Sequence, residues 1–240
     1  MLKLIKKDFM FGRNSLLINF ALLLVFGGVM FKISMLDSWL MIIILYIAIL
    51  VISPITMEDR LKTDSLMASM PLKRSTIINS RYLFAILIIL SVTIFMLSYG
   101  YVLERFISAN YIEYSNAFTF SRVFSMIFFS VILVSFLVPV VFRFGQNGMM
   151  IGLMGSMLLS TVVFMIIALG LKNTSLNTIL KRVLGGFFER IENGGISNFF
   201  AAVSANIGTL FGVLTLTATM AVLVYISMRV SLFVYKRKEF

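Results

Sequence analysis

The chain has 240 residues and a net charge of +11, with 60% hydrophobic and 13% charged residues. Soluble domains carry about 25% charged residues, so this composition leaves too little polar surface to cover a water-soluble globule. The basic residues sit at the ends of apolar segments, which argues against nucleic-acid binding and favours contact with anionic lipid headgroups. Because Cys and His are absent, disulfides, thiol chemistry and His/Cys metal sites are excluded in this chain.

Residues 1–14 are predicted to form an N-terminal interfacial helix, because basic residues and apolar residues alternate there at helical spacing. A first membrane span follows at about 15–31. No cleavage site rich in small residues comes after it, so we expect the span to be retained.

Five more apolar segments are long enough to cross a bilayer, at about 39–57, 82–103, 120–142, 149–171 and 207–228. Pro54 and Pro139 are expected to kink or end the second and fourth of the six spans. The composition of residues 145–148, Gly-Gln-Asn-Gly, predicts a tight turn. The sequence therefore predicts an all-α, polytopic membrane protein with six transmembrane helices in a single transmembrane domain, residues 1–240.

The distribution of basic residues predicts the orientation. Of the 21 Lys and Arg residues, 14 fall on the side that holds both termini, the 58–81 segment and the 143–148 turn. Basic residues favour the cytoplasmic side, so both termini are predicted to be cytoplasmic. The 172–206 segment then becomes an external loop. It carries an amphipathic helical pattern, followed at 198–205 by a small apolar stretch that can re-enter the bilayer.

Residues 58–81 form the most charged stretch of the chain and are interrupted by Pro71. A short helix is expected before Pro71, with Glu58 and Asp59 near its start, and Ser75 can cap a second helix that continues into the third span. This two-helix elbow combines apolar anchors with charges, as a protein-docking surface does. An ordinary solvated loop is the alternative.

The same stretch carries a recognisable motif. It reads Glu58-Asp59-Arg60, Thr63-Asp64-Ser65-Leu66, Ser69-Met70-Pro71-Leu72, Arg74, Ile77-Ile78 and Ser80-Arg81-Tyr82-Leu83. This pattern resembles that of ABC-2-type permeases, the membrane subunits of ATP-binding-cassette exporters, and in particular the permeases that export phenol-soluble modulins and antimicrobial peptides. Met70 and Lys73 depart from the usual residues of the motif.

The resemblance implies an ABC-2 (type V) exporter-like permease in a bacterial cytoplasmic membrane. Two permease subunits, identical or paralogous, would each dock an ABC ATPase subunit that binds ATP and Mg. Such a complex would export amphipathic peptides of the toxin or antimicrobial type, conferring resistance to them. The chain would not be an enzyme by itself, and ATPase activity is expected only in the complex.

The resemblance also implies which residues couple the permease to the ATPase. The elbow would supply polar contacts and an apolar plug, through Glu58, Asp59, Arg60, Lys62, Asp64, Met67, Met70 and Pro71.

Two absences from the sequence support this reading. The chain lacks a G-x-x-x-x-G-K-[ST] phosphate loop, so no cofactor is expected in it and the nucleotide site belongs to a partner. None of the six segments has Asp, Glu, Lys or His in its middle, which argues against an ion-coupled carrier or an intramembrane hydrolase. No catalytic residue and no metal ligand is predicted.

Small and aromatic residues in the spans suggest further roles. Small residues that allow close helix packing, within the subunit or across a dimer, are Gly148, Gly152, Ser156, Gly208 and Gly212. Aromatic residues that could line a substrate pathway or contact lipid are Phe124, Phe128 and Phe129.

Other functions remain open at the level of sequence. A permease for lipids or antibiotics is the alternative within the class. A non-transporting membrane scaffold and a small channel are alternatives from other classes. A scaffold would keep its function without ATP turnover in its partner, and a channel would conduct without ATP.

Overall fold

A computed structural model shows the architecture of the chain. It describes the stretches 36–61, 74–106, 119–145 and 208–237. Outside them it describes isolated positions, namely Leu4, Lys7, Phe9, Met10, Ala21, Val25, Asn147, Gly148, Met150, Ile151, Gly152, Met154, Gly155, Phe200, Ala201, Val203 and Ser204.

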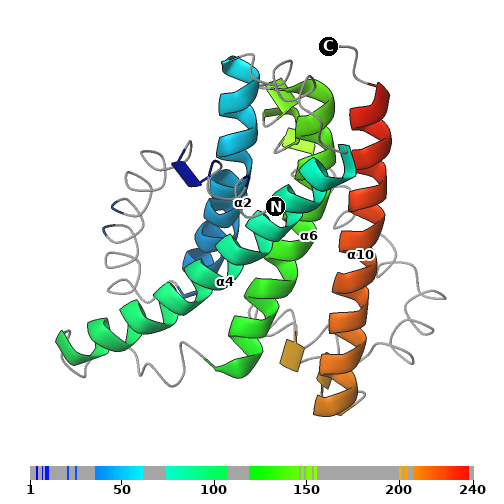
Figure 1. Ribbon diagram of the computed structural model, residues 1–240. Coiled ribbons are helices and arrows are strands. Elements are labelled where there is room, and N and C mark those ends of the chain that lie inside the picture. Colours follow the sequence, from blue (N-terminus) through cyan, green and yellow to red (C-terminus); the bar gives the residue numbers. More distant parts are fainter. Residues whose placement is uncertain are drawn as a thin grey trace, which may run out of the picture.

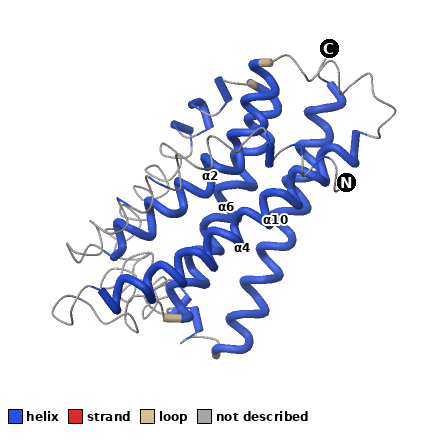
Figure 2. The backbone as a smooth tube through the Cα atoms, turned by 60° about the vertical axis from the view of Figure 1, so that its left-hand side comes forward, coloured by secondary structure: helices blue, strands red, loops and turns tan. Residues whose placement is uncertain are grey.

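Four long helices account for most of the described part: α2 (Leu36–Arg60), α4 (Arg74–Phe106), α6 (Phe120–Phe144) and α10 (Thr209–Arg237). Helix α6 lies between α2 and α10 and packs most extensively against these two (Figure 1). Helix α4 crosses the bundle obliquely and contacts the other three helices. The described part of the chain contains helices, turns and loops and no strand (Figure 2), so the predicted all-α class is confirmed.

Helix α4 shows how an almost wholly apolar sequence still selects one face for the core. Its buried residues recur at spacings of three and four: Ile77, Ile78, Ser80, Arg81, Tyr82, Phe84, Ala85, Ile88, Ile89, Val92, Thr93 and Met96. Its exposed side carries equally apolar residues, including Leu83, Ile86, Leu87, Leu90 and Ile94. A helix that is apolar on all sides is expected where lipid replaces water around a bundle.

Three of the described helices are long and apolar enough to cross a membrane: Arg74–Tyr99, Phe120–Phe144 and Thr209–Tyr235. They match the predicted third, fourth and sixth spans. The predicted second span lies in α2, whose apolar part is shorter, Ile42–Glu58. The first and fifth predicted spans lie outside the described residues, apart from isolated helical positions, so six spans remain a prediction.

Neither proline ends its helix. Pro54 lies inside α2 and Pro139 lies inside α6, and both helices continue beyond them to Arg60 and Phe144. The alternative that these prolines terminate the spans was therefore wrong. A proline removes one backbone donor, and packing on both sides of it can hold the remaining turns in place.

The predicted tight turn after the fourth span is confirmed. Gly145 has a φ of 60°, a left-handed conformation that suits glycine, and its amide donates to the Val141 carbonyl at 2.8 Å. The amide of Gly148 donates to the Gly145 carbonyl at 2.9 Å. The chain thus reverses within a few residues at the end of α6.

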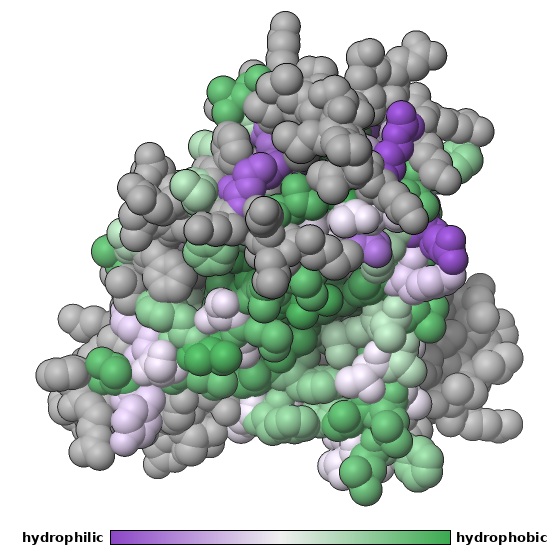
Figure 3. All heavy atoms as spheres, viewed as in Figure 1, coloured by the Kyte–Doolittle hydropathy of each residue, from purple (hydrophilic) through white to green (hydrophobic). Residues whose placement is uncertain are grey.

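The helices place the predicted connections at one end of the bundle. Helices α2 and α6 end there, α4 begins there, and the C-terminal end of α10 lies there too (Figure 1). Ring contact between Phe142 and Tyr235, with centroids 5.7 Å apart, joins the ends of α6 and α10. Hydrophilic side chains gather in the upper half of the molecule, towards this end, while the lower half of the same face is mainly hydrophobic (Figure 3). This arrangement agrees with the prediction that the 58–81 segment, the 143–148 turn and the C-terminus lie on the same side. That this side is cytoplasmic remains a prediction.

Candidate functional site

The structure corrects the expected start of the 58–81 segment. Helix α2 runs without a break through Glu58 to Arg60, so Glu58 and Asp59 lie in its last turn and do not begin a new helix. The second helix of the elbow is continuous with the third span, as predicted, because α4 extends from Arg74 to Phe106. Ser75 lies inside that helix and is exposed.

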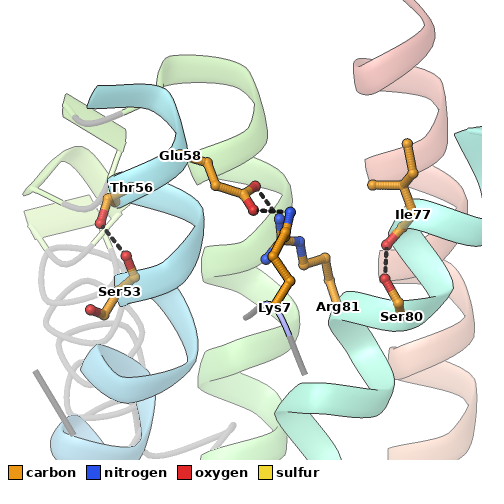
Figure 4. A network of polar contacts seen from close by, with 7 residues as sticks. All are labelled: Lys7, Ser53, Thr56, Glu58, Ile77, Ser80 and Arg81. Atoms are coloured by element: carbon orange, nitrogen blue, oxygen red, sulfur yellow. Dashed lines mark hydrogen bonds and ion pairs between the residues drawn. The ribbon is translucent and has the colours of Figure 1, made fainter. Parts of the chain in front are cut away.

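Glu58 is the centre of a buried cluster of charges. Its side chain is 2% exposed and pairs through Oε2 with the guanidinium of Arg81, which is 3% exposed. Its other oxygen, Oε1, accepts a hydrogen bond from Nζ of Lys7, which is 28% exposed. Figure 4 shows the two cations meeting the carboxylate from α4 and from the N-terminal region. We call these three residues the ionic cluster.

The two cations keep the carboxylate charged. Burial raises the pKa of the Glu58 carboxyl, but the charges and hydrogen bonds of Arg81 and Lys7 outweigh burial and hold that pKa below its ordinary value. A buried ion pair of this kind costs desolvation, and removal of one partner leaves an uncompensated charge. Among the described residues, no group of His, Cys, Asp and Glu side chains could hold a metal ion.

The ionic cluster ties three parts of the chain together at the two ends of the 62–73 connection. Glu58 and Arg81 flank that connection on α2 and α4, and Lys7 belongs to the N-terminal region. An edge-to-face contact between Phe9 and Phe84, with ring centroids 6.1 Å apart, adds an apolar link between the same N-terminal region and α4. A displacement of the connection would therefore reach the N-terminal region as well as the two helices.

The predicted ATPase contacts fall into two groups. Glu58 is buried and paired with Arg81 in this structure, and its role in coupling stays a prediction. The side chains of the other residues lie outside the described part of the structure, so their roles remain predictions: Asp59, Arg60, Lys62, Asp64, Met67, Met70 and Pro71.

A second buried polar contact joins α4 to α10 just below the ionic cluster. The hydroxyl of Tyr82 lies 2.8 Å from Ser231 Oγ and 2.5 Å from Ser227 Oγ. Ser227 Oγ also donates to the Ser135 carbonyl of α6 at 2.5 Å. Helices α4, α6 and α10 therefore share one hydrogen-bonded group in a region otherwise made of apolar side chains.

The phenylalanines expected along a pathway instead form an internal cluster near the start of α6. Phe128 is 8% exposed and packs with Phe200 and Leu216, while Phe124 and Phe129 pack against them. The rings of Phe124 and Phe200 are 4.8 Å apart, and the Phe200 amide donates to Ser125 Oγ at 3.0 Å. In this structure these side chains pack around Phe200 against α6, and their role along a substrate pathway stays a prediction.

The glycines differ in what surrounds them. A Cβ at Gly148 would lie 2.7 Å from Val141 Cα, and one at Gly152 would lie 2.5 Å from Leu137 Cδ2, so both approach α6 of the same chain. Gly212 lies near the backbone of Ser204, whereas Gly208 has a φ of +83° and open space around it. Ser156 lies outside the described residues.

Sequence reasoning did not anticipate that Arg81 and Lys7 neutralise Glu58, or that Tyr82 meets two serines. One signal was present for each. A single Glu directly after an apolar segment needs a cation if it is buried, and the spacing of four between Ser227 and Ser231 places both on one face of a helix.

Comparison with known proteins is consistent with these features. No curated protein and no solved structure matches the chain. The model of one family, described as ABC-2 family transporter protein, matches residues 3–236, almost the whole chain. On that match, and with its long apolar helices, the chain belongs to the ABC-2 family of transporter proteins and is a membrane permease.

Proposed function

We propose that this permease exports amphipathic peptides from the cytoplasm or the membrane, driven by ATP hydrolysis on separate ABC ATPase subunits. The observation that carries the ATP-driven part is the family match over residues 3–236 in a chain without a phosphate-binding loop. The nucleotide site must then be supplied by a partner, and a second permease subunit would complete the exporter.

The ionic cluster supports a particular route for coupling. Glu58 on α2 and Arg81 on α4 flank the 62–73 connection in the sequence and form a buried ion pair. An ATPase bound to this connection would move α2 and α4 together, because separating Glu58 from Arg81 would leave two buried charges unpaired. The contact residues would be those of the connection itself, with Asp64 the most informative to change.

Two features of the surface support an amphipathic cargo. Exposed apolar side chains line much of α4 and α10, and the middle of each predicted span lacks Asp, Glu, Lys and His. Such a surface suits a molecule that moves along the boundary between protein and lipid, and it suits small hydrated ions poorly. The same surface would also suit a lipid or an apolar antibiotic, which is the alternative cargo.

Co-purification tests the ATP-driven part. The chain is tagged at its C-terminus, solubilised gently, and the co-purifying proteins are identified for the wild type and for Asp64→Lys. We expect a soluble ATPase with the wild type and its loss with Asp64→Lys. Glu113→Lys is the matched control, since it makes the same charge reversal in a segment predicted to lie on the opposite side of the membrane. If a stable wild-type sample brings down no ATPase, the scaffold or channel alternatives replace this proposal.

Transport into inside-out vesicles tests the cargo. Vesicles that contain the complex are given ATP and either a fluorescent amphipathic helical peptide or a fluorescent phospholipid. ATP-dependent uptake of the peptide supports the proposal, whereas movement of the lipid alone favours the alternative cargo. Conduction of ions without ATP would indicate a channel.

A further inference from the structure

Arg229 occupies an unusual place in α10. It is exposed, and it lies inside the apolar segment Thr209–Tyr235, six residues before the end of that segment. At 1.5 Å per residue, this places its Cα about 9 Å from that end. Of the three long apolar helices, α10 is the least buried inside the chain. The predicted sixth span ends at residue 228, so Arg229 faces the surroundings of the protein where that span meets the headgroup region.

The exposed neighbours of Arg229 are apolar or aromatic and follow helical spacing: Val222, Tyr225, Ile226, Val230 and Phe233. Residues three, four and seven positions away share one face of a helix. The guanidinium thus lies in the middle of an apolar stripe, which is the side of a membrane helix that meets lipid.

Tyr225 holds the guanidinium in a defined position. Nε and Nη2 of Arg229 both donate to the Tyr225 hydroxyl, at 3.0 Å and 2.7 Å, and the guanidinium carbon lies 5.1 Å from the ring centre. These contacts turn the charge back towards the start of α10. They use one edge of the guanidinium, so the edge formed by Nη1 and the second Nη2 hydrogen remains for another acceptor. The Tyr225 hydroxyl accepts in these contacts and keeps its own hydrogen to donate.

The missing acceptor should be an anion, and the side chains that the structure describes offer none in that position. Glu58 is the only carboxylate among the side chains that the structure describes, and it pairs with Arg81 and Lys7. A second copy of the chain could not supply one within its spans either, because the six predicted spans contain no Asp or Glu. Phospholipid phosphates, in contrast, surround every membrane helix in the headgroup region, where the predicted sixth span ends.

We propose that Arg229 and Tyr225 form a binding site for the phosphate of an anionic phospholipid, in the leaflet on the side of the 58–81 segment. The free guanidinium edge binds two phosphate oxygens, the geometry for which arginine is suited. The Tyr225 hydroxyl donates to the same phosphate, and the acyl chains lie along Val222 and Ile226, deeper in the membrane. The site does not depend on ATP coupling or on the exported cargo.

Lipid binding by the purified, full-length chain tests the site. Native mass spectrometry follows the titration of phosphatidylglycerol, with phosphatidylcholine and inorganic phosphate as comparison ligands. We expect Arg229→Gln to weaken phosphatidylglycerol binding about fivefold, the effect of one basic residue at an anionic surface. Arg229→Lys and Tyr225→Phe should each cause a smaller loss of affinity. Lysine keeps the positive charge but cannot donate two parallel hydrogen bonds, and Tyr225→Phe keeps the guanidinium but removes the hydroxyl that positions it.

Arg143→Gln is the matched control. Arg143 is also exposed and also lies over an aromatic ring, Phe144, at 5.4 Å, but at the very end of α6. Arg143→Gln should weaken binding less than Arg229→Gln, because Phe144 has no hydroxyl to hold the guanidinium or to donate to the phosphate. Inorganic phosphate should not compete, because it lacks acyl chains.

Three results would overturn the proposal. The first is phosphatidylglycerol binding unaffected by Arg229→Gln in a sample whose helicity and elution match the wild type. The second is a wild-type oligomer in lipid-free detergent that Arg229→Gln no longer forms, which would assign Arg229 to a protein interface. The third applies if Arg229→Gln does not fold: it is phosphatidylglycerol binding that is unchanged in both Arg229→Lys and Tyr225→Phe.

Discussion

Glu58 in the last turn of α2 and Arg81 in α4 are 23 residues apart in sequence and form a buried ion pair. Between them lies the connection in which the permease motif has its most charged residues. The pair thus joins the helix that enters the connection to the helix that leaves it. Lys7 adds the N-terminal region to the same carboxylate. One carboxylate therefore joins α2, α4 and the N-terminal region.

Neutralising the carboxylate should destabilise the protein strongly. Glu58→Gln leaves the Arg81 guanidinium buried without its counter-charge, and breaking a buried pair in this way costs about 3–5 kcal/mol. We expect a large fall in the melting temperature of the protein in detergent. Far-UV circular dichroism measures this temperature. Glu113→Gln, which makes the same change in the predicted external segment after span three, should melt like the wild type.

A charge exchange separates the ion pair from other effects of the substitution. The double variant Glu58→Arg with Arg81→Glu restores opposite charges at the same two positions, so it should be more stable than either single variant. If Glu58→Gln melts like the wild type, or the double variant is less stable than both single ones, the carboxylate and guanidinium do not stabilise each other.

Lys7 should matter less for stability and more for the position of the N-terminal region. In Lys7→Met the carboxylate keeps Arg81, and Lys7 is already partly exposed, so the melting temperature should fall less than in Glu58→Gln. The natural chain has no Cys, so cysteines at positions 9 and 84, in place of a ring pair 6.1 Å apart, can be joined by a short bismaleimide. We expect Lys7→Met to slow this cross-link several-fold and Lys3→Met to leave its rate unchanged. Equal rates in both would show that Lys7 does not hold the region in place.

Tyr82 should contribute through its hydroxyl alone. Tyr82→Phe removes the partner of Ser231 and one of the two partners of Ser227, while the ring remains to fill the same space. Hydrogen bonds between membrane helices average about 0.6 kcal/mol, so a loss of about 1 kcal/mol is expected for the two contacts. Tyr101→Phe is the control, because Tyr101 is 52% exposed. In a double-mutant cycle, additivity between Tyr82→Phe and Ser231→Ala would contradict a direct bond.

The sequence predicted the parts of the fold that follow from long-range apolar patterning. The apolar segments around Ile88, Val134 and Leu216 appear as long helices, and the turn at Gly145 is where composition placed it. In a bilayer, backbone hydrogen bonds must be satisfied within each segment, so apolar length alone determines the helix. Helix ends were less predictable, because packing carried α2 past Pro54 to Arg60.

The candidate site was harder to predict because it depends on contacts between segments. Charge density located the 58–81 segment, but it suggested that Glu58 faces a partner, whereas the structure pairs it with Arg81 and Lys7. The phenylalanines illustrate the same limit, since an aromatic stripe looks the same whether it lines a pathway, contacts lipid or meets Phe200 inside the chain. Local sequence specifies the face of a helix but not what lies opposite.

The glycines after α6 give a graded test of how closely the chain packs there. Alanine at Gly148 would bring its Cβ within 2.7 Å of Val141 Cα and 2.9 Å of the Val140 carbonyl, which are backbone atoms that cannot turn aside. At Gly152 the Cβ would meet only the end of the Leu137 side chain, at 2.5 Å, and at Gly155 it would meet nothing within 4 Å. Overpacking costs about 1–3 kcal/mol, whereas replacing a helical glycine in open space by alanine stabilises a helix by up to about 1 kcal/mol. The melting temperature should therefore fall most for Gly148→Ala, fall less for Gly152→Ala, and stay equal or rise for Gly155→Ala. A reversed order, with Gly155→Ala the least stable, would show that the segment after α6 does not pack against α6 through Gly148 and Gly152.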